Sequence, residues 1–108
     1  MALPKARVSM AETAKKGELV EIKTLMRHPM ETGYRVDRVG KPIPRHIVQL
    51  LTVDYNGAEI FRMNMTQGVA ANPYISFFAL ARESGDFLFR WEDDLGEVVT
   101  VTKTLTVT

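Results

Sequence analysis

Apolar and polar residues alternate along much of the chain with a period of two, which is typical of β-strands that bury one face. The apolar positions are Phe87, Phe89 and Trp91 in residues 86–92, and Val99, Val101, Leu105 and Val107 in residues 98–108. Threonines fill the opposite side of the last segment, and Lys103 is the one polar residue on its apolar side. A lysine at such a position is typical of an edge strand, or of a side chain that reaches the solvent at the rim of the core.

Turn sequences separate these strands at short intervals. Asn56-Gly57 is the strongest, because a type I′ hairpin needs positive φ at both central residues. Gly17, Ser84-Gly85 and residues 93–96 mark further turns. No window repeats its apolar residues at three and four, so no long helix is expected, although residues 67–72 suit a helical turn or a crossover. About seven strands at this spacing predict one antiparallel β-sandwich domain over residues 1–108, with residues 1–5 flexible.

Two strands carry apolar residues on both faces. Residues 73–81 put Ile75, Phe77, Ala79 and Ala81 on one side, and Tyr74, Phe78 and Leu80 on the other. Residues 46–55 put Ile47, Leu51, Val53 and Tyr55 on one side, and Val48 and Leu50 on the other. An antiparallel sandwich strand normally leaves one face in water, so the second faces need a cover. We expect a partner protein to supply it, because one loop shields too little apolar surface.

Composition narrows the function further. The chain has 108 residues, a net charge of +1 and no cysteine, which excludes disulfides and thiolate chemistry. No apolar run is long enough for a signal peptide or a membrane span. Residues 1–50 hold ten Lys and Arg against five Asp and Glu, whereas residues 51–108 hold four against eight. Without a clear basic stripe, nucleic-acid binding is disfavoured.

The segment MRHPMETG holds the main candidate for metal chemistry. Met26, His28 and Met30 alternate, and two thioethers with an imidazole suit Cu(I). Against this, Pro29 ends a strand, methionine often fills cores, and a further ligand is not evident, so we assign no metal. Acid/base work by His28 with Glu31 is weaker still. The chain has only two histidines, and the pair Asp93-Asp94 suits a turn cap, so we expect no catalytic residue and no enzyme.

The longest irregular stretch is residues 28–45. Its basic residues are Arg35, Arg38, Lys41 and Arg45. These side chains could gather around an anion, but a charged loop that keeps the protein soluble is the favoured interpretation. Pro42 and Pro44 stiffen whatever the loop presents.

Several segments together resemble the SoxZ family, the Z subunit of the thiosulfate-oxidation carrier complex. They are KKGELVEIKTLMRHPMETGYR, DRVGKPIPRHIV, YNGAEIF and ANPYISFFALARESGDFLFRWEDDLG, and they cover nearly the whole chain from about Ala6. The resemblance implies an immunoglobulin-like fold and pairing with SoxY, whose mobile C-terminal arm holds sulfur intermediates on a cysteine. This chain would be the non-carrying subunit, working in the periplasm after export with its signal-bearing partner.

From the two-faced strands and the resemblance together, we expect that the chain docks SoxY through an apolar sheet face. It would help present sulfur intermediates to Sox enzymes, without a cofactor. The expected partner contacts are Met30, Tyr74, Phe78 and Leu80, with Ile43 and Pro44 at the rim. Arg35, Arg38 and Arg45 are candidates for anion or client-enzyme contacts. The alternative hypothesis is a periplasmic copper-binding domain that uses Met26, His28 and Met30.

Overall fold

The computed structural model describes residues 5–108, so most of the segment predicted to be flexible lies outside the described residues. All regular structure in the described chain is β. The strands are β1 Ala6–Ser9, β2 Thr13–Ala14, β3 Leu19–Met26, β4 Val48–Tyr55, β5 Ala58–Asn64, β6 Tyr74–Leu80, β7 Gly85–Asp93 and β8 Val98–Val107. Among residues 5–108 there is accordingly no helix long and apolar enough to cross a membrane.

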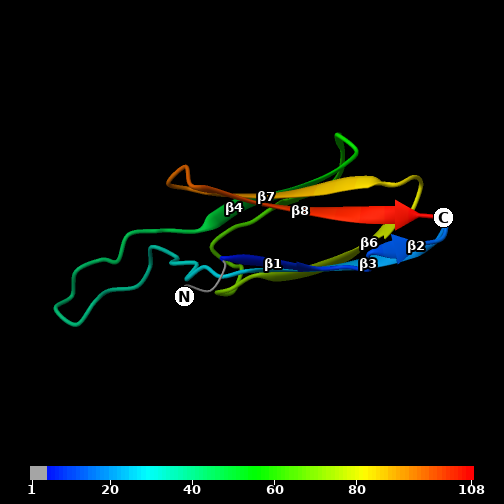
Figure 1. Cartoon of the computed structure of the whole chain (residues 1–108). Coiled ribbons are helices and arrows are strands. Elements are labelled where there is room, and N and C mark those ends of the chain that lie inside the picture. Colours follow the sequence, from blue (N-terminus) through cyan, green and yellow to red (C-terminus); the bar gives the residue numbers. More distant parts are fainter. Residues whose placement is uncertain (1–4) are drawn as a thin grey trace, which may run out of the picture.

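The strands form two sheets packed face to face (Figure 1). The smaller sheet has the order β1-β3-β6, and the larger has the order β2-β8-β7-β4-β5. Pairing is antiparallel except where the two-residue β2 lies parallel to β8. The predicted antiparallel sandwich is confirmed, and β2 is the strand that the alternation pattern was too short to reveal. Residues 67–72 connect β5 to β6 without a helix, so the crossover interpretation is the correct one.

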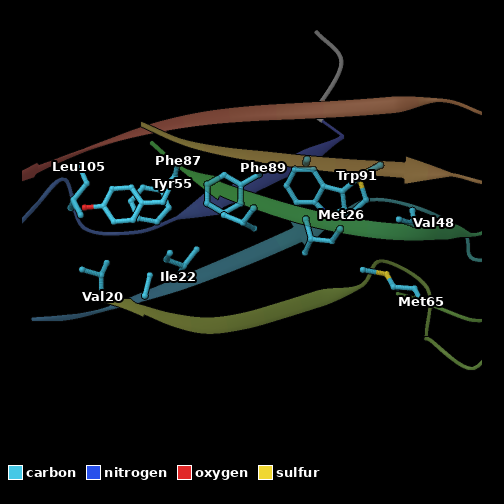
Figure 2. Close-up of a cluster of buried hydrophobic side chains, with 14 of the residues drawn as sticks. Val20, Ile22, Met26, Val48, Tyr55, Met65, Phe87, Phe89, Trp91 and Leu105 are labelled. Atoms are coloured by element: carbon cyan, nitrogen blue, oxygen red, sulfur yellow. The ribbon is translucent and has the colours of Figure 1, made fainter. Parts of the chain in front are cut away.

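Aromatic side chains from the larger sheet fill the centre of the core (Figure 2). The ring centroids of Tyr55 and Phe87 lie 4.1 Å apart, and Phe89 and Trp91 continue the row along β7. Phe87, Phe89 and Trp91 are almost fully buried, as the alternation predicted. Phe77 is only partly buried and stacks on Phe61 at a centroid distance of 4.2 Å. Stacked aromatic burial of this kind replaces the inter-sheet disulfide that cysteine would supply.

The prediction of a second apolar face on residues 46–55 is wrong for Val48. Val48 and Leu51 are both fully buried, although they are an odd number of residues apart. The pairing of β4 with β7 shifts register between Val48 and Leu50, and this irregularity changes which side of the strand points inward. Strict alternation could not anticipate that shift, because one extra residue changes the side to which a strand position before it points.

The turn at Asn56-Gly57 is anchored at one end of the sandwich. Both residues have positive φ, 50° and 84°, as a type I′ turn requires. The Tyr55 hydroxyl accepts hydrogen bonds from the backbone N–H groups of Arg82 and Glu83 and donates one to the Glu83 carbonyl. This hydroxyl therefore ties the end of β4 to the connection between β6 and β7.

Candidate functional site

An apolar patch lies on the outer face of the smaller sheet. Four of its side chains are exposed, Leu19 by 64%, Tyr74 by 58%, Phe78 by 63% and Leu80 by 43%. The strand register places Leu19 opposite Leu80, and Glu21 opposite Phe78. We call these four residues the apolar patch.

The patch follows directly from the two-faced sequence of β6. Ile75, Phe77 and Ala79 point into the sandwich, so the residues between them must point outward. In addition, β6 is the last strand of its sheet, so one of its backbone edges has no strand partner in the described chain. An exposed edge beside an apolar face is a surface on which another chain can add.

Residues 31–46, which connect β3 to β4, form a long arm (Figure 1). The arm projects from the end of the sandwich opposite the Asn56-Gly57 turn. Isolated bridges join Glu31 to His46 and Val36 to Pro42, so the arm is an irregular hairpin. At its tip, Asp37 Oδ1 accepts hydrogen bonds from the N–H groups of Val39 and Lys41. The proline-containing loop expected from sequence is therefore an organised projection.

The arm exposes apolar residues that sequence reasoning missed. Tyr34 is 82% exposed and Val39 80%. Of the predicted rim contacts on the arm, Pro44 is exposed and Ile43 is partly buried. Exposed aromatic and aliphatic side chains on a projection can contact a partner, but no periodic pattern in this segment set them apart.

The arginines of the arm do not converge on one point. Arg35 Nε lies 3.2 Å from Glu31 Oε2 as an ion pair, and Arg45 Nε lies 3.1 Å from Asp94 Oδ2. Arg38 is exposed and makes no ion pair with a described residue. Two of the three guanidinium groups proposed for anion binding are thus already engaged with carboxylates.

Met30 is placed in the core, which corrects its assignment as a partner-facing contact. Its side chain is only 4% exposed, and its Sδ accepts a hydrogen bond from the Val48 N–H at 3.2 Å. Met26 is equally buried. These thioethers are buried, and the Met30 sulfur already accepts from a backbone donor. Met26 and His28 line one small cavity that Met30 does not line, so the three residues of the alternative copper hypothesis do not share an open site.

His28 instead meets two residues that are distant in the sequence. His28 Nε2 lies 3.3 Å from His46 Nε2, which lies 3.1 Å from Asp93 Oδ2. His28 follows β3, His46 precedes β4, and Asp93 ends β7, so three chain segments converge at the base of the arm. The ligand atoms of this His–His–Asp cluster all lie within 4.8 Å of one another.

Asp93 has two roles, one from each oxygen. Its Oδ1 accepts hydrogen bonds from the N–H groups of Leu95 and Glu97, which is the turn cap predicted for this pair of aspartates. Its Oδ2 faces His46. Burial alone would raise the pKa of Asp93, but the hydrogen bonds from His46 and from these backbone groups outweigh it and hold the pKa below its usual value.

The pKa of His28 is also lowered, first by burial and then by the neighbouring His46. The Met30 N–H donates a hydrogen bond to His28 Nδ1 at 3.0 Å. In the neutral ring the hydrogen must therefore sit on Nε2, which points at His46. Sequence reasoning had both histidines and Asp93 in view but had no signal that the fold brings them together.

Comparisons with solved structures agree on the fold. Superoxide reductase (neelaredoxin) T24K from Ignicoccus hospitalis matches with a TM-score of 0.76 and 15% identity, covering 97% of this chain and 81% of that one. A putative superoxide reductase from Thermotoga maritima matches at 0.74 and 16%, covering 95% and 85%. The sulfur carrier protein SoxY from Chlorobium limicola f thiosulfatophilum matches at 0.67 and 10%, covering 99% and 86%. At these identities the likeness concerns the fold alone.

The sequence comparison is more specific. No curated protein matches the chain. The family model described as sulphur oxidation protein SoxZ matches residues 7–104, which is almost the whole chain and includes most of β1 and most of β8. The match covers the segments whose resemblance was noted from the residues alone. The chain belongs to the SoxZ family.

Proposed function

We propose that the chain is the non-catalytic subunit of a SoxYZ sulfur-carrier heterodimer. It binds a SoxY subunit and helps present the sulfur intermediates held on that partner's cysteine to Sox enzymes. The family membership supports a role in the Sox system. The sequence contains no cysteine, which agrees with a proposal in which the partner's cysteine holds the sulfur cargo.

The single observation that carries the docking proposal is the apolar patch. Phe78 and Tyr74 are both more than half exposed on the outer face of β6. Aromatic side chains bury about 150–250 Å² each, at roughly 25 cal/mol per Å² of apolar area. Covering both side chains with a partner therefore contributes several kcal/mol of gross stabilisation to the complex. Contributions of this size are typical of aromatic residues at the centre of an interface.

The decisive experiment replaces Phe78 with Asp and measures co-purification with a SoxY subunit co-expressed from the same organism. A charge at the centre of the patch is expected to abolish pairing, because the carboxylate would be buried without a partner. The matched control is Leu95→Asp, since Leu95 is 73% exposed in the turn between β7 and β8, outside the patch. The control is expected to pair normally.

Thermal unfolding of the isolated Phe78→Asp chain accompanies this experiment. Its midpoint should match that of the unmodified chain, since the side chain is exposed. Normal pairing by the Phe78→Asp chain would remove the outer face of β6 from the interface.

We further propose that the heterodimer works in the periplasm and that this subunit arrives there folded with its signal-bearing partner. Fractionation of cells that express the chain with and without SoxY checks this. The chain is expected in the periplasmic fraction only when SoxY is present, and the Phe78→Asp variant is expected to stay in the cytoplasm. Export without the partner would contradict the shared route.

A further inference from the structure

We propose that His28, His46 and Asp93 form a binding site for one divalent metal ion of the zinc type at the base of the arm. The site is separate from the apolar patch and does not depend on the proposed partner. Two imidazoles and one carboxylate form a ligand set that suits Zn²⁺, with a fourth position open to water. The three residues come from three different segments of the fold.

Two of the three spacings between ligand atoms fit a tetrahedral ion. Zn²⁺ binds nitrogen and oxygen at about 2.0–2.1 Å, and two ligands of a tetrahedron are then about 3.3 Å apart. His28 Nε2 and His46 Nε2 are 3.3 Å apart, and His46 Nε2 and Asp93 Oδ2 are 3.1 Å apart. The three ligand atoms all lie within 4.8 Å of one another. The third pair, from His28 and Asp93, must therefore close by up to about 1.5 Å for one ion to contact all three atoms.

Hydrogen bonding alone does not satisfy this cluster. His28 Nε2 carries a hydrogen in the neutral ring, because its Nδ1 accepts from Met30. If His46 Nε2 also carries a hydrogen, it can donate to Asp93, but its hydrogen then faces the hydrogen on His28 Nε2. If His46 Nε2 carries a lone pair, it can accept from His28, but this lone pair then faces those of the Asp93 carboxylate. One of the two contacts is unfavourable in either state, whereas a cation between three lone pairs removes the conflict.

The carboxylate is already oriented for binding. Two backbone N–H groups hold Asp93 Oδ1, which leaves Oδ2 directed toward His46. Such outer hydrogen bonds fix ligand orientation in metal sites. A cavity of about 130 Å³ lies beside the cluster and is lined by His28, His46 and Asp93. The His46 side chain is 31% exposed, so an ion can reach the site from solvent.

Metal binding would break one hydrogen bond that the metal-free protein makes, and this loss can be observed. A ring that binds metal through Nε2 carries its hydrogen on Nδ1. In His28 that hydrogen would face the Met30 N–H, which now donates to the same atom. The ion must therefore change the His28 tautomer and release the Met30 amide, so the affinity is expected to be moderate. The result would be a clamp that joins the base of the arm to the end of β7.

The test uses tag-free full-length chain treated with chelator and then dialysed against Zn²⁺ or Co²⁺ near neutral pH. One equivalent of Zn²⁺ is expected, and Co²⁺ should give the visible absorption of a tetrahedral site. His46→Gln and Asp93→Asn should each weaken binding by at least about ten-fold, since losing even an outer-shell partner costs about 10- to 100-fold. Asp93→Asn keeps an oxygen to cap the turn. Asp86→Asn, at the opposite end of β7, is the control and should bind normally.

Nuclear magnetic resonance distinguishes this site from adventitious binding. On adding Zn²⁺, the nitrogen shifts of His28 should report a change from the Nε2–H to the Nδ1–H tautomer, and the Met30 amide should exchange faster with solvent. The thermal midpoint should also rise with Zn²⁺ in the unmodified chain and in Asp86→Asn, but not in His46→Gln. The proposal is overturned if no ion binds, if His46→Gln and Asp93→Asn bind as tightly as the unmodified chain, or if the His28 tautomer is unchanged.

Discussion

The two outer faces of the sandwich are built on the same strand alternation but differ in what they present to solvent. The smaller sheet shows the apolar patch of Leu19, Tyr74, Phe78 and Leu80. The larger sheet shows mostly polar groups: Arg90 Nη1 donates to Glu92 Oε2, and the Thr104 hydroxyl donates to Asp86 Oδ1. Both sheets bury an apolar inner face, so folding requires no apolar residues outside. This difference supports the proposal that the patch binds a partner, because large exposed apolar patches often mark interaction sites.

The strongest way to test this comparison is to separate inward from outward aromatic residues. Phe89 is fully buried, and Phe89→Ala should lower the free energy of unfolding by about 3–5 kcal/mol through lost burial and a cavity. Phe78→Ala should change it by less than about 0.5 kcal/mol, because its side chain is 63% exposed. Urea unfolding of both variants measures the contrast. A large loss for Phe78→Ala would mean that the patch helps to stabilise the isolated chain.

The second prediction concerns affinity for the SoxY subunit. Phe78→Ala should weaken pairing by about 2 kcal/mol, the usual size for a central aromatic anchor. Leu88→Ala is the matched control, because Leu88 is 38% exposed and lies on the outer face of the larger sheet. It is expected to leave the affinity unchanged. Titration calorimetry with purified subunits gives both values, and equal losses would show that the two faces do not differ in function.

Third, we expect the loss of stability in acid to come from the base of the arm and not from either outer face. The pKa of His28 is lowered in the folded state, by burial and by His46 and Lys5, against the raising effects of Asp93 and Asp94. The unfolded chain therefore binds a proton more readily, so metal-free protein should lose stability as the pH falls below the ordinary value of 6.5.

The variant His28→Gln removes the titrating ring and should flatten this slope, measured by urea unfolding in chelator at several pH values. Leu88→Ala, on an outer face, should keep the slope of the unmodified chain. An unchanged slope in His28→Gln would assign the acid sensitivity to other groups.

The smallest effect is expected on the polar face. The ion pair of Arg90 with Glu92 joins two side chains that are each about 40% exposed. Solvent screens such pairs, so Arg90→Ala should cost no more than about 1 kcal/mol. Thermal unfolding at low and high salt checks this, and the difference between the variant and the unmodified chain should shrink as salt rises. A larger, salt-independent loss would mean that Arg90 stabilises the sheet through packing of its stem.

Much of the architecture could be predicted because it depends on local patterns. Alternation placed Phe87, Phe89 and Trp91 in the core, and Asn56-Gly57 marked a turn whose φ values are both positive. The β6 part of the apolar patch was also predicted, since Tyr74, Phe78 and Leu80 alternate with inward residues, whereas Leu19 on β3 was not. The inward position of Val48 was missed, because the register shift in β4 depends on how β4 pairs with β7.

The site at the base of the arm was the harder case. His28 was noted from its neighbours Met26 and Met30, and that neighbourhood favoured a thioether set. The fold turns those sulfurs into the core and brings His46 and Asp93 to the imidazole instead. His28 and His46 are 18 positions apart in the sequence, and His46 and Asp93 are 47 apart. No local pattern predicts that such distant residues come into contact.

By itself, the sequence determined a two-layer β fold, its aromatic core and the existence of an outward apolar strand face, because each follows from side chains that alternate along a strand. Only the tertiary structure decided that the arm projects as a hairpin, that its arginines are partly paired, and that two histidines and an aspartate converge at its base. Those features depend on which strand ends lie side by side, and strand order is set by packing between sheets.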